Sequence, residues 1–264
     1  MSNPQEAQPN LTHSRVLIIS PHPDDEVIGA GSRLSHLNGA AVVQVTDGSP
    51  RDLRDGHANG FTTREDYAAA RRAELRAALA LAGRFETIHL DIPDQEASLH
   101  LAQLTHTLAE LFTRLVPEII LTVPYEGGHP DHDATAFAVH NALHLSCSPA
   151  RIVEMTAYHN SPRGCTYNEF LNPPTNQSTF HLTAEERALK QRMFDCFKTQ
   201  FPVLQWFPIG IEKFRFAPHY DFTLAPHPGS LYYELFPWGV SGNEWRTLAR
   251  EALESVCSTT IASL

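Results

Sequence analysis

The sequence predicts an α/β fold in which a mostly parallel sheet carries helices on both faces. Short β-branched apolar runs recur along the chain, segments with helical spacing separate them, and polar motifs follow two of the runs. Strands that alternate with helices in this way form right-handed βαβ units. The 264 residues, 42% of them apolar and 19% charged, supply enough apolar side chains for the core of such a domain.

The first βα unit is the clearest. Residues 16–19 (Val-Leu-Ile-Ile) form a continuous apolar run, which is the pattern of a buried parallel strand. Residues 26–38 follow with apolar side chains at helical spacing, and Gly39 is the usual kind of residue just after a helix. Residues 41–46 are the next expected strand.

The same alternation continues through the middle of the chain. The further expected elements are a helix over 63–82, a strand over 87–90, a helix over 98–116, a strand over 118–123, a helix over 131–145 and a strand over 152–157. This order is typical of a Rossmann-like sheet.

Beyond about residue 160 the alternation stops. Residues 201–245 contain twelve of the 24 Phe, Trp and Tyr residues and six of the 19 prolines. Proline at this density argues against long helices and central strands. We therefore expect an irregular, aromatic and Pro-rich C-terminal cap and a final helix over 243–256. The whole of 1–264 is expected to form one domain, with a core over 15–200 and the cap and helix over 201–264.

Two smaller features have structural interpretations. The connection over 47–62 is long for a βα loop, and loops of this length tend to be functional lids or disordered. Gly29 and Gly31 lie inside a predicted helix and lack the third glycine of a dinucleotide fingerprint. We therefore interpret these two glycines as positions of close helix packing.

Composition excludes several partners. The formal net charge is −10, whereas a nucleic-acid-binding domain is expected to show a basic patch, so no nucleic acid partner is expected. The N-terminus has no basic and apolar signal segment, and no apolar run approaches the length of a membrane span. These features predict a cytoplasmic protein without a membrane span. They do not decide between a monomer and a homo-oligomer.

The strongest local motif follows the first predicted strand. Residues 20–26 read Ser-Pro-His-Pro-Asp-Asp-Glu. Ligands of open α/β sheets bind beyond the carboxyl ends of the strands, and the two prolines restrict the backbone of this segment. An aspartate that caps the next helix is the structural alternative. Because a cap needs only one aspartate, a functional role is favoured.

A second motif follows the strand over 118–123. Residues 127–132 read Gly-Gly-His-Pro-Asp-His, and the carboxyl ends of parallel strands meet at one edge of a sheet. The two motifs together supply His, Asp and His, which is the three-ligand pattern of a catalytic zinc site with an open position.

The motifs at 22–26 and 129–132 resemble the PIG-L/LmbE-like family of zinc-dependent N-acetylglucosamine deacetylases. The resemblance covers roughly residues 15 to 200 and includes weaker matches at 46–48, 71–74, 94 and 190–200. It implies hydrolysis of an N-acyl group, expected to be N-acetyl, from an amino-sugar conjugate. The resemblance does not extend to the aromatic segment from about residue 201, and the substrate therefore stays open.

The resemblance also implies roles for individual residues. The metal ligands would be His22, Asp25 and His132, with Zn²⁺ or Fe²⁺ as the ion. Zn²⁺ would polarise the amide carbonyl and lower the pKa of a water.

The remaining implied roles concern proton transfer and substrate binding. Asp24 would be the general base, and His129 a charged group that stabilises the transition state, held in its tautomer by Asp131. Arg71 and Asp94 would bind sugar hydroxyls. The aromatic cap is expected to shield part of this crevice, while most of its aromatic side chains pack in the cap or the core.

Two other functions use the same residues. A metal-dependent phosphoesterase could share the ligands, although two-metal sites usually need more carboxylates and histidines than these motifs supply. A non-catalytic sugar-binding relative would be expected to lack Asp24 or His129, and both are present.

Overall fold

The computed structural model describes residue 11 and residues 15–173 and 177–262. Its strands are β1 (Val16–Ser20), β2 (Ala41–Pro50), β3 (Glu86–Asp94), β4 (Ile119–Thr122), β5 (Arg151–Met155), β6 (Tyr158–Ser161), β7 (Gly164–Tyr167), β8 (Ser178–His181) and β9 (Ile211–Phe216). Its α-helices are α1 (Asp25–Leu34), α2 (Arg54–Ala58), α3 (Arg64–Ala82), α4 (Leu101–Leu115), α5 (Pro130–Leu145), α6 (Ala184–Phe194), α7 (Phe201–Leu204) and α8 (Gly242–Ala262). Three short 3₁₀ segments are η1 (Ala97–His100), η2 (Lys198–Gln200) and η3 (Tyr232–Leu235).

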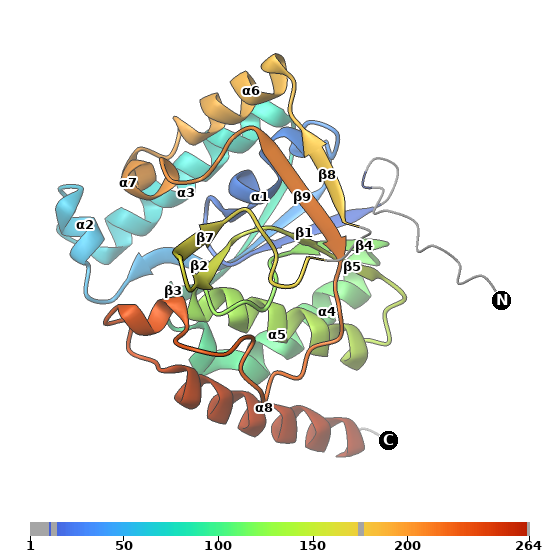
Figure 1. Ribbon diagram of the computed structural model, residues 1–264. Helices are drawn as coiled ribbons and strands as arrows, with labels where there is room; N and C mark the ends of the chain where they lie inside the picture. Colours follow the sequence, from blue (N-terminus) through green and yellow to red (C-terminus); the bar gives the residue numbers. More distant parts are fainter. Residues whose placement is uncertain (1–10, 12–14, 174–176, 263–264) are drawn as a thin grey trace.

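One mixed sheet organises the described chain (Figure 1). Its strand order is β3-β2-β1-β4-β5-β9-β8, and β6 and β7 form a separate antiparallel hairpin. The strands from β3 to β5 are parallel, whereas β9 is antiparallel to both β5 and β8. Chain order reverses between β1 and β4, and ligands of open sheets bind at such a switch point. Both sequence motifs follow these two strands.

Helices cover both faces of the sheet, which confirms the predicted α/β class. Successive side chains of β1 point to opposite faces, so Leu17 and Ile19 pack in one core and Val16 and Ile18 in the other. Helices α4, α5 and α8 cover the first face, and α1, α3 and α6 cover the second (Figure 1). In the described part, no helix is both long enough and apolar enough to cross a membrane.

The connection over 47–62 is structured, so the alternative of a disordered loop is wrong. Strand β2 continues to Pro50 because it stays paired with β3, and α2 occupies part of the remainder. The polar sequence of this extension does not show the pairing, which depends on a distant strand.

Strand β9 lies inside the sheet between β5 and β8, so the expectation that the Pro-rich region contains no central strand is also wrong. Residues 211–216 contain no proline, and Pro208 and Pro218 lie outside the strand. The segment between β9 and α8 is irregular apart from η3, as expected, and α8 covers the predicted final helix.

A buried ion pair fixes the shape of α1. Ala30 has non-helical dihedral angles (φ −138°, ψ 15°), and near it Ser32 N donates to Glu212 Oε1 at 2.8 Å. The carbonyl of Ile28 accepts a hydrogen bond from Lys190 Nζ at 2.7 Å, and Lys190 Nζ lies 3.0 Å from Glu212 Oε1. In a regular α-helix, the amide of residue 32 and the carbonyl of residue 28 would bond to each other. The Lys190–Glu212 pair therefore gives both groups a partner at the kink.

Close packing of α1 is confirmed at both glycines. A Cβ atom at Gly29 would lie 2.5 Å from Met155 Cγ, and one at Gly31 would lie 3.2 Å from Lys190 Cγ. The helix therefore sits directly against β5 and α6, and its first turn is held at the carboxyl edge of the sheet.

Candidate active site

A cavity of about 310 Å³ lies where the two motifs meet. Its polar side comes from the segments after β1 and β4 and from α2, α3 and β3, and its apolar side comes from the β6–β7 hairpin and the C-terminal region. The polar lining residues are His22, Asp24, Asp25, Asp55, Arg71, Asp94, Gln95, His129, His132 and Gln200. The structure thus brings the predicted site residues to one place; Asp131 does not line the cavity but contacts His22 from behind.

A tight turn determines the conformation of the first motif. The carbonyl of His22 accepts hydrogen bonds from Asp24 N at 3.0 Å and from Asp25 N at 3.3 Å. Asp24 has φ +153°, a backbone region that side-chain-bearing residues seldom adopt and that costs roughly 1–3 kcal/mol. The turn places both carboxylates at the start of α1, facing the cavity.

A tightly packed loop holds the second motif in position. Asp133 Oδ1 accepts hydrogen bonds from the main-chain amides of Glu126 and Gly127 at 3.2 and 3.0 Å. A Cβ atom at Gly128 would lie 2.1 Å from the carbonyl oxygen of Tyr158, so only glycine fits there. Pro130 then begins α5, which carries His132 on its first turn.

Three nitrogen atoms converge on one oxygen of Asp25. This group lies next to Nδ1 of His22, and we call it the Nδ1 side of His22. His22 Nδ1 lies 3.1 Å and His132 Nε2 3.3 Å from Asp25 Oδ2, and the main-chain amide of His22 donates to the same oxygen at 2.9 Å. All three residues are buried. They form one of the two groups in the described chain whose ligand atoms are close enough to hold a metal ion.

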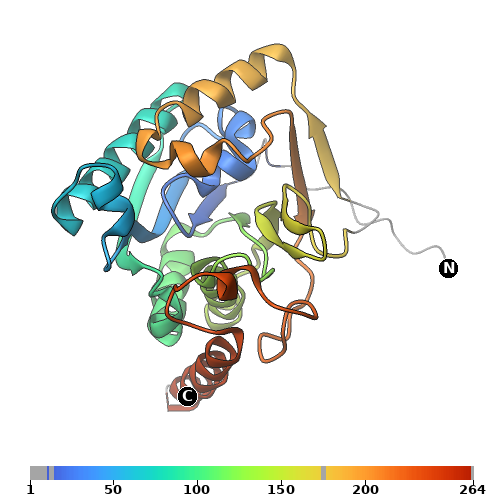
Figure 2. The same cartoon turned by 60° about the vertical axis from the view of Figure 1, so that its left-hand side comes forward.

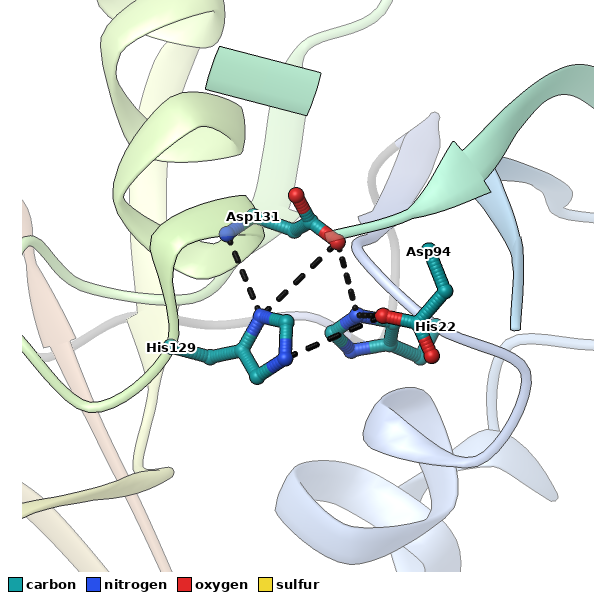
Figure 3. A group of neighbouring side chains, drawn as sticks. All are labelled: His22, Asp94, His129 and Asp131. Atoms are coloured by element: carbon teal, nitrogen blue, oxygen red, sulfur yellow. Dashed lines mark hydrogen bonds and ion pairs between the residues drawn. The ribbon is translucent and has the colours of Figure 1, made fainter. Parts of the chain in front are cut away.

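The second group lies on the Nε2 side of His22 (Figure 3). His22 Nε2 lies 3.1 Å from Asp94 Oδ1 and 3.2 Å from Asp131 Oδ2, and the ring of His129 packs edge-on against the ring of His22. The carboxylate of Asp131 is already engaged, since Gln95 N donates to Oδ2 at 2.6 Å and Ala97 N to Oδ1 at 2.9 Å.

His129 is oriented by the main chain of Asp131. Its Nδ1 accepts a hydrogen bond from Asp131 N at 3.2 Å, which assigns the proton to Nε2. The carboxylate of Asp131 lies 3.8 Å from the same nitrogen and is closer to His22. We expected the side chain of Asp131 to hold His129 in its tautomer. In the structure the main-chain amide of Asp131 makes this contact instead.

Together, burial and neighbouring charges raise the pKa of His22 and lower those of Asp25 and His129. Burial alone would lower the pKa of His22, but the carboxylates of Asp94, Asp131 and Asp25 raise it above the usual histidine value. For Asp25, burial raises the pKa, but the imidazoles of His132 and His22 bring it well below its usual range. Burial and the adjacent His22 lower the pKa of His129, which favours its neutral form.

Asp24 and Arg71 form a buried pair at the cavity wall. Arg71 Nη2 donates to the carbonyl of Pro23 at 3.0 Å and to Asp24 Oδ2 at 3.2 Å. Burial raises the pKa of Asp24 to about 6, although Arg71 opposes this shift. Within the described chain, Nε and Nη1 of Arg71 have no hydrogen-bond partner and are buried. The guanidinium therefore has donors left for a ligand.

Aromatic residues complete the cavity, and several of them, including Trp238, come from the segment after residue 200, so the expectation that the cap shields part of the crevice is confirmed. Trp238 lies 4.5 Å from His129 and Tyr158 lies 5.3 Å from His132, measured between ring centroids. The sequence analysis did not single out either residue. Tyr158 follows β5 at the same edge of the sheet, which could have indicated it, but no local pattern indicates Trp238.

Comparison with known proteins adds independent information. The family profile described as "PIG-L: GlcNAc-PI de-N-acetylase" matches residues 17–143. The chain is 31% identical over 142 residues to the "Uncharacterized deacetylase YaiS" of Escherichia coli, covering 50% of this chain and 67% of that protein. It is 30% identical over 131 residues to the diacetylchitobiose deacetylase of Thermococcus kodakarensis, covering 47% of this chain. That match spans 46% of the Thermococcus protein, which is about half its length.

The fold has a counterpart among solved structures. The A40926 pseudoaglycone deacetylase Dbv21 superimposes with a TM-score of 0.58 at 25% identity, over 73% of this chain and 84% of that chain. The matched profile contains both histidine motifs and the strands that carry them, and the E. coli relative is matched over two thirds of its length. The chain belongs to the PIG-L family.

Proposed function

We propose that this protein is a divalent-metal-dependent hydrolase that removes an N-acetyl group from an amino-sugar conjugate. The observation that carries the proposal is the convergence of His22 Nδ1 and His132 Nε2 on one oxygen of Asp25, inside a cavity that also contains Asp24 and His129. Family membership and the names of the deacetylase relatives support the choice of reaction.

The donor set fits a metal ion. Ligand atoms about 2.0 to 2.2 Å from a tetrahedral zinc are roughly 3.3 to 3.6 Å apart. The separations of 3.1 and 3.3 Å at Asp25 Oδ2 are close to this range. Neutral imidazole and carboxylate suit Zn²⁺, and Fe²⁺ is the other ion that the family resemblance brings.

The ligand side of His22 follows from what each group already binds. Both oxygens of Asp131 accept main-chain hydrogen bonds, and Nδ1 of His129 accepts one. Among the described residues, Asp25 accepts its main-chain hydrogen bond on Oδ2 alone. We therefore place the ligands on the Nδ1 side, with His22, Asp25 and His132. Asp131 then accepts the Nε2 proton of His22, which is the usual arrangement behind a metal-binding histidine, and Asp94 Oδ1 lies 3.1 Å from the same nitrogen.

The chain's own groups supply the proton transfers. A bound divalent ion polarises the amide carbonyl and makes a water more acidic. Asp24, with a pKa of about 6, is largely ionised at neutral pH and accepts the proton of the attacking water. Asp24 then returns this proton to the amine nitrogen as the C–N bond breaks, and acetate is the other product. The lowered pKa of His129 changes the expected charged helper into a neutral one, whose Nε2–H donates to the oxyanion. Arg71 keeps Asp24 in place with one nitrogen.

We assign two residues, Arg71 and Asp94, to binding the sugar. The unpartnered Nε and Nη1 of Arg71 are donors for sugar oxygens, and Asp94 lines the cavity as an acceptor. These roles were implied by the resemblance, and the burial of Arg71 at the cavity wall supports them.

The test is a screen of the full chain for amine release from N-acetylglucosamine conjugates, with the metal content measured on the same sample. We expect release that depends on a stoichiometric divalent ion and that a chelator abolishes. The Asp24→Asn variant, loaded with the same amount of metal, is the matched control and should release amine far more slowly. A metal-loaded wild-type protein that releases no amine from any conjugate would contradict the proposal.

A further inference from the structure

The turn at the end of β3 contains a residue in an unfavourable backbone conformation. The carbonyl of Pro93 accepts a hydrogen bond from Glu96 N at 3.1 Å, so residues 93–96 form a tight turn just before η1 (Figure 2). Gln95 occupies the third position of this turn with φ +72°. A positive φ at that position usually requires glycine, because a side chain crowds the backbone there. Glycine would therefore form the same turn more easily than glutamine.

The main chain of Gln95 is held by a carboxylate of the active site. Gln95 N donates to Asp131 Oδ2 at 2.6 Å, and the same oxygen lies 3.2 Å from His22 Nε2. This contact uses only the amide of the main chain, and it accounts for the position of the turn. It does not account for the side chain, because glycine would offer the same amide.

The side chain of Gln95 lines the active-site cavity. Among the described residues, none forms a hydrogen bond with its side-chain amide, in contrast to its main-chain N–H. Gln200 also lines the cavity but differs, because its Nε2 already donates to the hydroxyl of Tyr67 at 2.9 Å. Gln95 therefore keeps both its amide donors and its carbonyl acceptor for a ligand.

Other residues with a positive φ show what such a conformation can serve. Asn168 has φ +57°, and its side chain donates to the carbonyl of Ile211 at 3.0 Å, so a contact within the protein accompanies its conformation. Of the described non-glycine residues with a positive φ, two line the cavity, Asp24 and Gln95. Unfavourable backbone conformations are concentrated at functional sites. Asp24 is the proposed base, and Gln95 is the one without a role.

We propose that Gln95 is a specificity-determining residue whose side-chain amide forms a hydrogen bond with a hydroxyl group of the substrate sugar. This inference rests on the proposed function and adds a contact to it. Asp94 precedes Gln95 in the turn and lines the same cavity. A carboxylate only accepts hydrogen bonds, whereas an amide both donates and accepts. The two neighbouring side chains therefore suit two hydroxyls of one sugar ring, each of which can donate and accept.

The variant Gln95→Gly separates the side chain from the main chain. Glycine keeps the amide that donates to Asp131 and adopts a positive φ without strain. The variant should therefore bind as much metal as wild type and unfold at the same or a higher denaturant concentration. Elemental analysis and denaturant unfolding measure both properties. A decrease in either would show that the side chain has a structural role and would overturn the inference.

The decisive measurement is the discrimination among sugar hydroxyls. Amine release is measured for the methyl glycoside of N-acetylglucosamine and for its 3-, 4- and 6-deoxy analogues. In wild type, loss of the hydroxyl that Gln95 binds should lower kcat/KM by about tenfold, the scale of one neutral hydrogen bond. In Gln95→Gly the penalty for this same hydroxyl should fall to about twofold or less, while the penalties for the other two hydroxyls stay unchanged.

Cys147→Gly is the matched control. Cys147 also has a positive φ, +49°, but it is exposed and does not line the cavity. Its replacement relieves a similar backbone conformation without changing the site. This variant should keep all three wild-type penalties.

The opposing outcomes are distinct. Equal penalties in wild type and in Gln95→Gly, or a wild type that is insensitive to all three hydroxyls, would overturn the inference. Both results would leave the proposed function standing, because amine is still released. No amine release by the metal-loaded wild type, from the methyl glycoside or from any conjugate of the screen, would refute the proposed function and the inference together.

Discussion

The two ring nitrogens of His22 face two groups of His and Asp side chains. The groups are similar in composition but differ in how their oxygen and nitrogen atoms are already hydrogen-bonded. On the Nδ1 side, Asp25 Oδ2 is shared by His22 and His132, so several donors compete for one oxygen. On the Nε2 side, the carboxylate of Asp131 is satisfied by two main-chain amides, and His129 Nδ1 by a third. This difference supports our proposal that the Nδ1 side receives a cation, while the other side orients the histidine and the reacting groups.

The largest effect is expected from a ligand on the Nδ1 side. His132→Ala should lose the metal, and turnover should fall by on the order of 10⁴-fold or more, because the ion and its chemistry are removed together. Elemental analysis and an amine-release assay measure both. His144→Ala, an exposed position on the same helix, is the control and should retain metal and turnover. Full metal occupancy in His132→Ala would place the ion elsewhere.

Asp24→Asn is expected to keep the metal and slow turnover by about 10² to 10⁴, since it removes the proton acceptor without removing a ligand. The direction in which kcat/KM changes with pH is a second expected result. In wild type, kcat/KM should rise as pH increases through about 6, because the ionised form of Asp24 is the base. This acid limb should be absent from the residual activity of the variant. A variant that keeps an unchanged limb would assign the base to another group.

His129→Ala should also keep the metal, and turnover should fall by about 10² to 10³, the scale for one oxyanion donor. This result would separate His129 from His132, which a purely metal-binding motif would treat alike. If His129→Ala loses its metal as completely as His132→Ala, the distinction between the two sides of His22 fails.

A smaller effect is expected at Asp131. Asp131→Asn should weaken metal affinity by about 10 to 100-fold, as is typical when the carboxylate behind a metal-binding histidine is replaced. In the metal-free protein this carboxylate helps to raise the pKa of His22, so metal binding must displace a proton. Calorimetry of Zn²⁺ binding in buffers of different ionisation enthalpy should therefore show fewer protons released by the variant. Equal proton release would argue against this coupling.

The smallest effect on chemistry is expected from the ion pair behind α1. Lys190→Met removes the cation 3.0 Å from the buried Glu212 and leaves Arg33 Nε, 3.9 Å from Glu212 Oε2, as the remaining charged partner. The variant should lower the free energy of unfolding by up to about 3 to 5 kcal/mol. Denaturant unfolding measures this change. Because the pair supports α1, which carries Asp24 and Asp25, metal retention should fall more than in a surface variant such as Lys198→Met. Unchanged stability would show that the kink needs no such support.

The sequence was sufficient for the parts of the molecule that depend on local patterns. Apolar runs and helical spacing indicate β1 and α1, and the carboxyl-edge rule brings His22 and His132 together. Strand β9 and the ordered 47–62 connection were missed because each depends on pairing with a distant strand. The contact of the Asp131 carboxylate with His22, and the position of Trp238 over His129, likewise arise only when distant segments pack.

The position of a bound ion relative to His22 tests the central claim most directly. Crystals of the zinc-loaded protein, measured at the zinc absorption edge, would locate the ion by anomalous scattering. The account predicts a peak about 2.0 to 2.2 Å from His22 Nδ1, from an Asp25 carboxylate oxygen and from His132 Nε2, with Asp131 hydrogen-bonded to His22 Nε2. A peak bound instead by His22 Nε2, Asp94, His129 and Asp131 would contradict it.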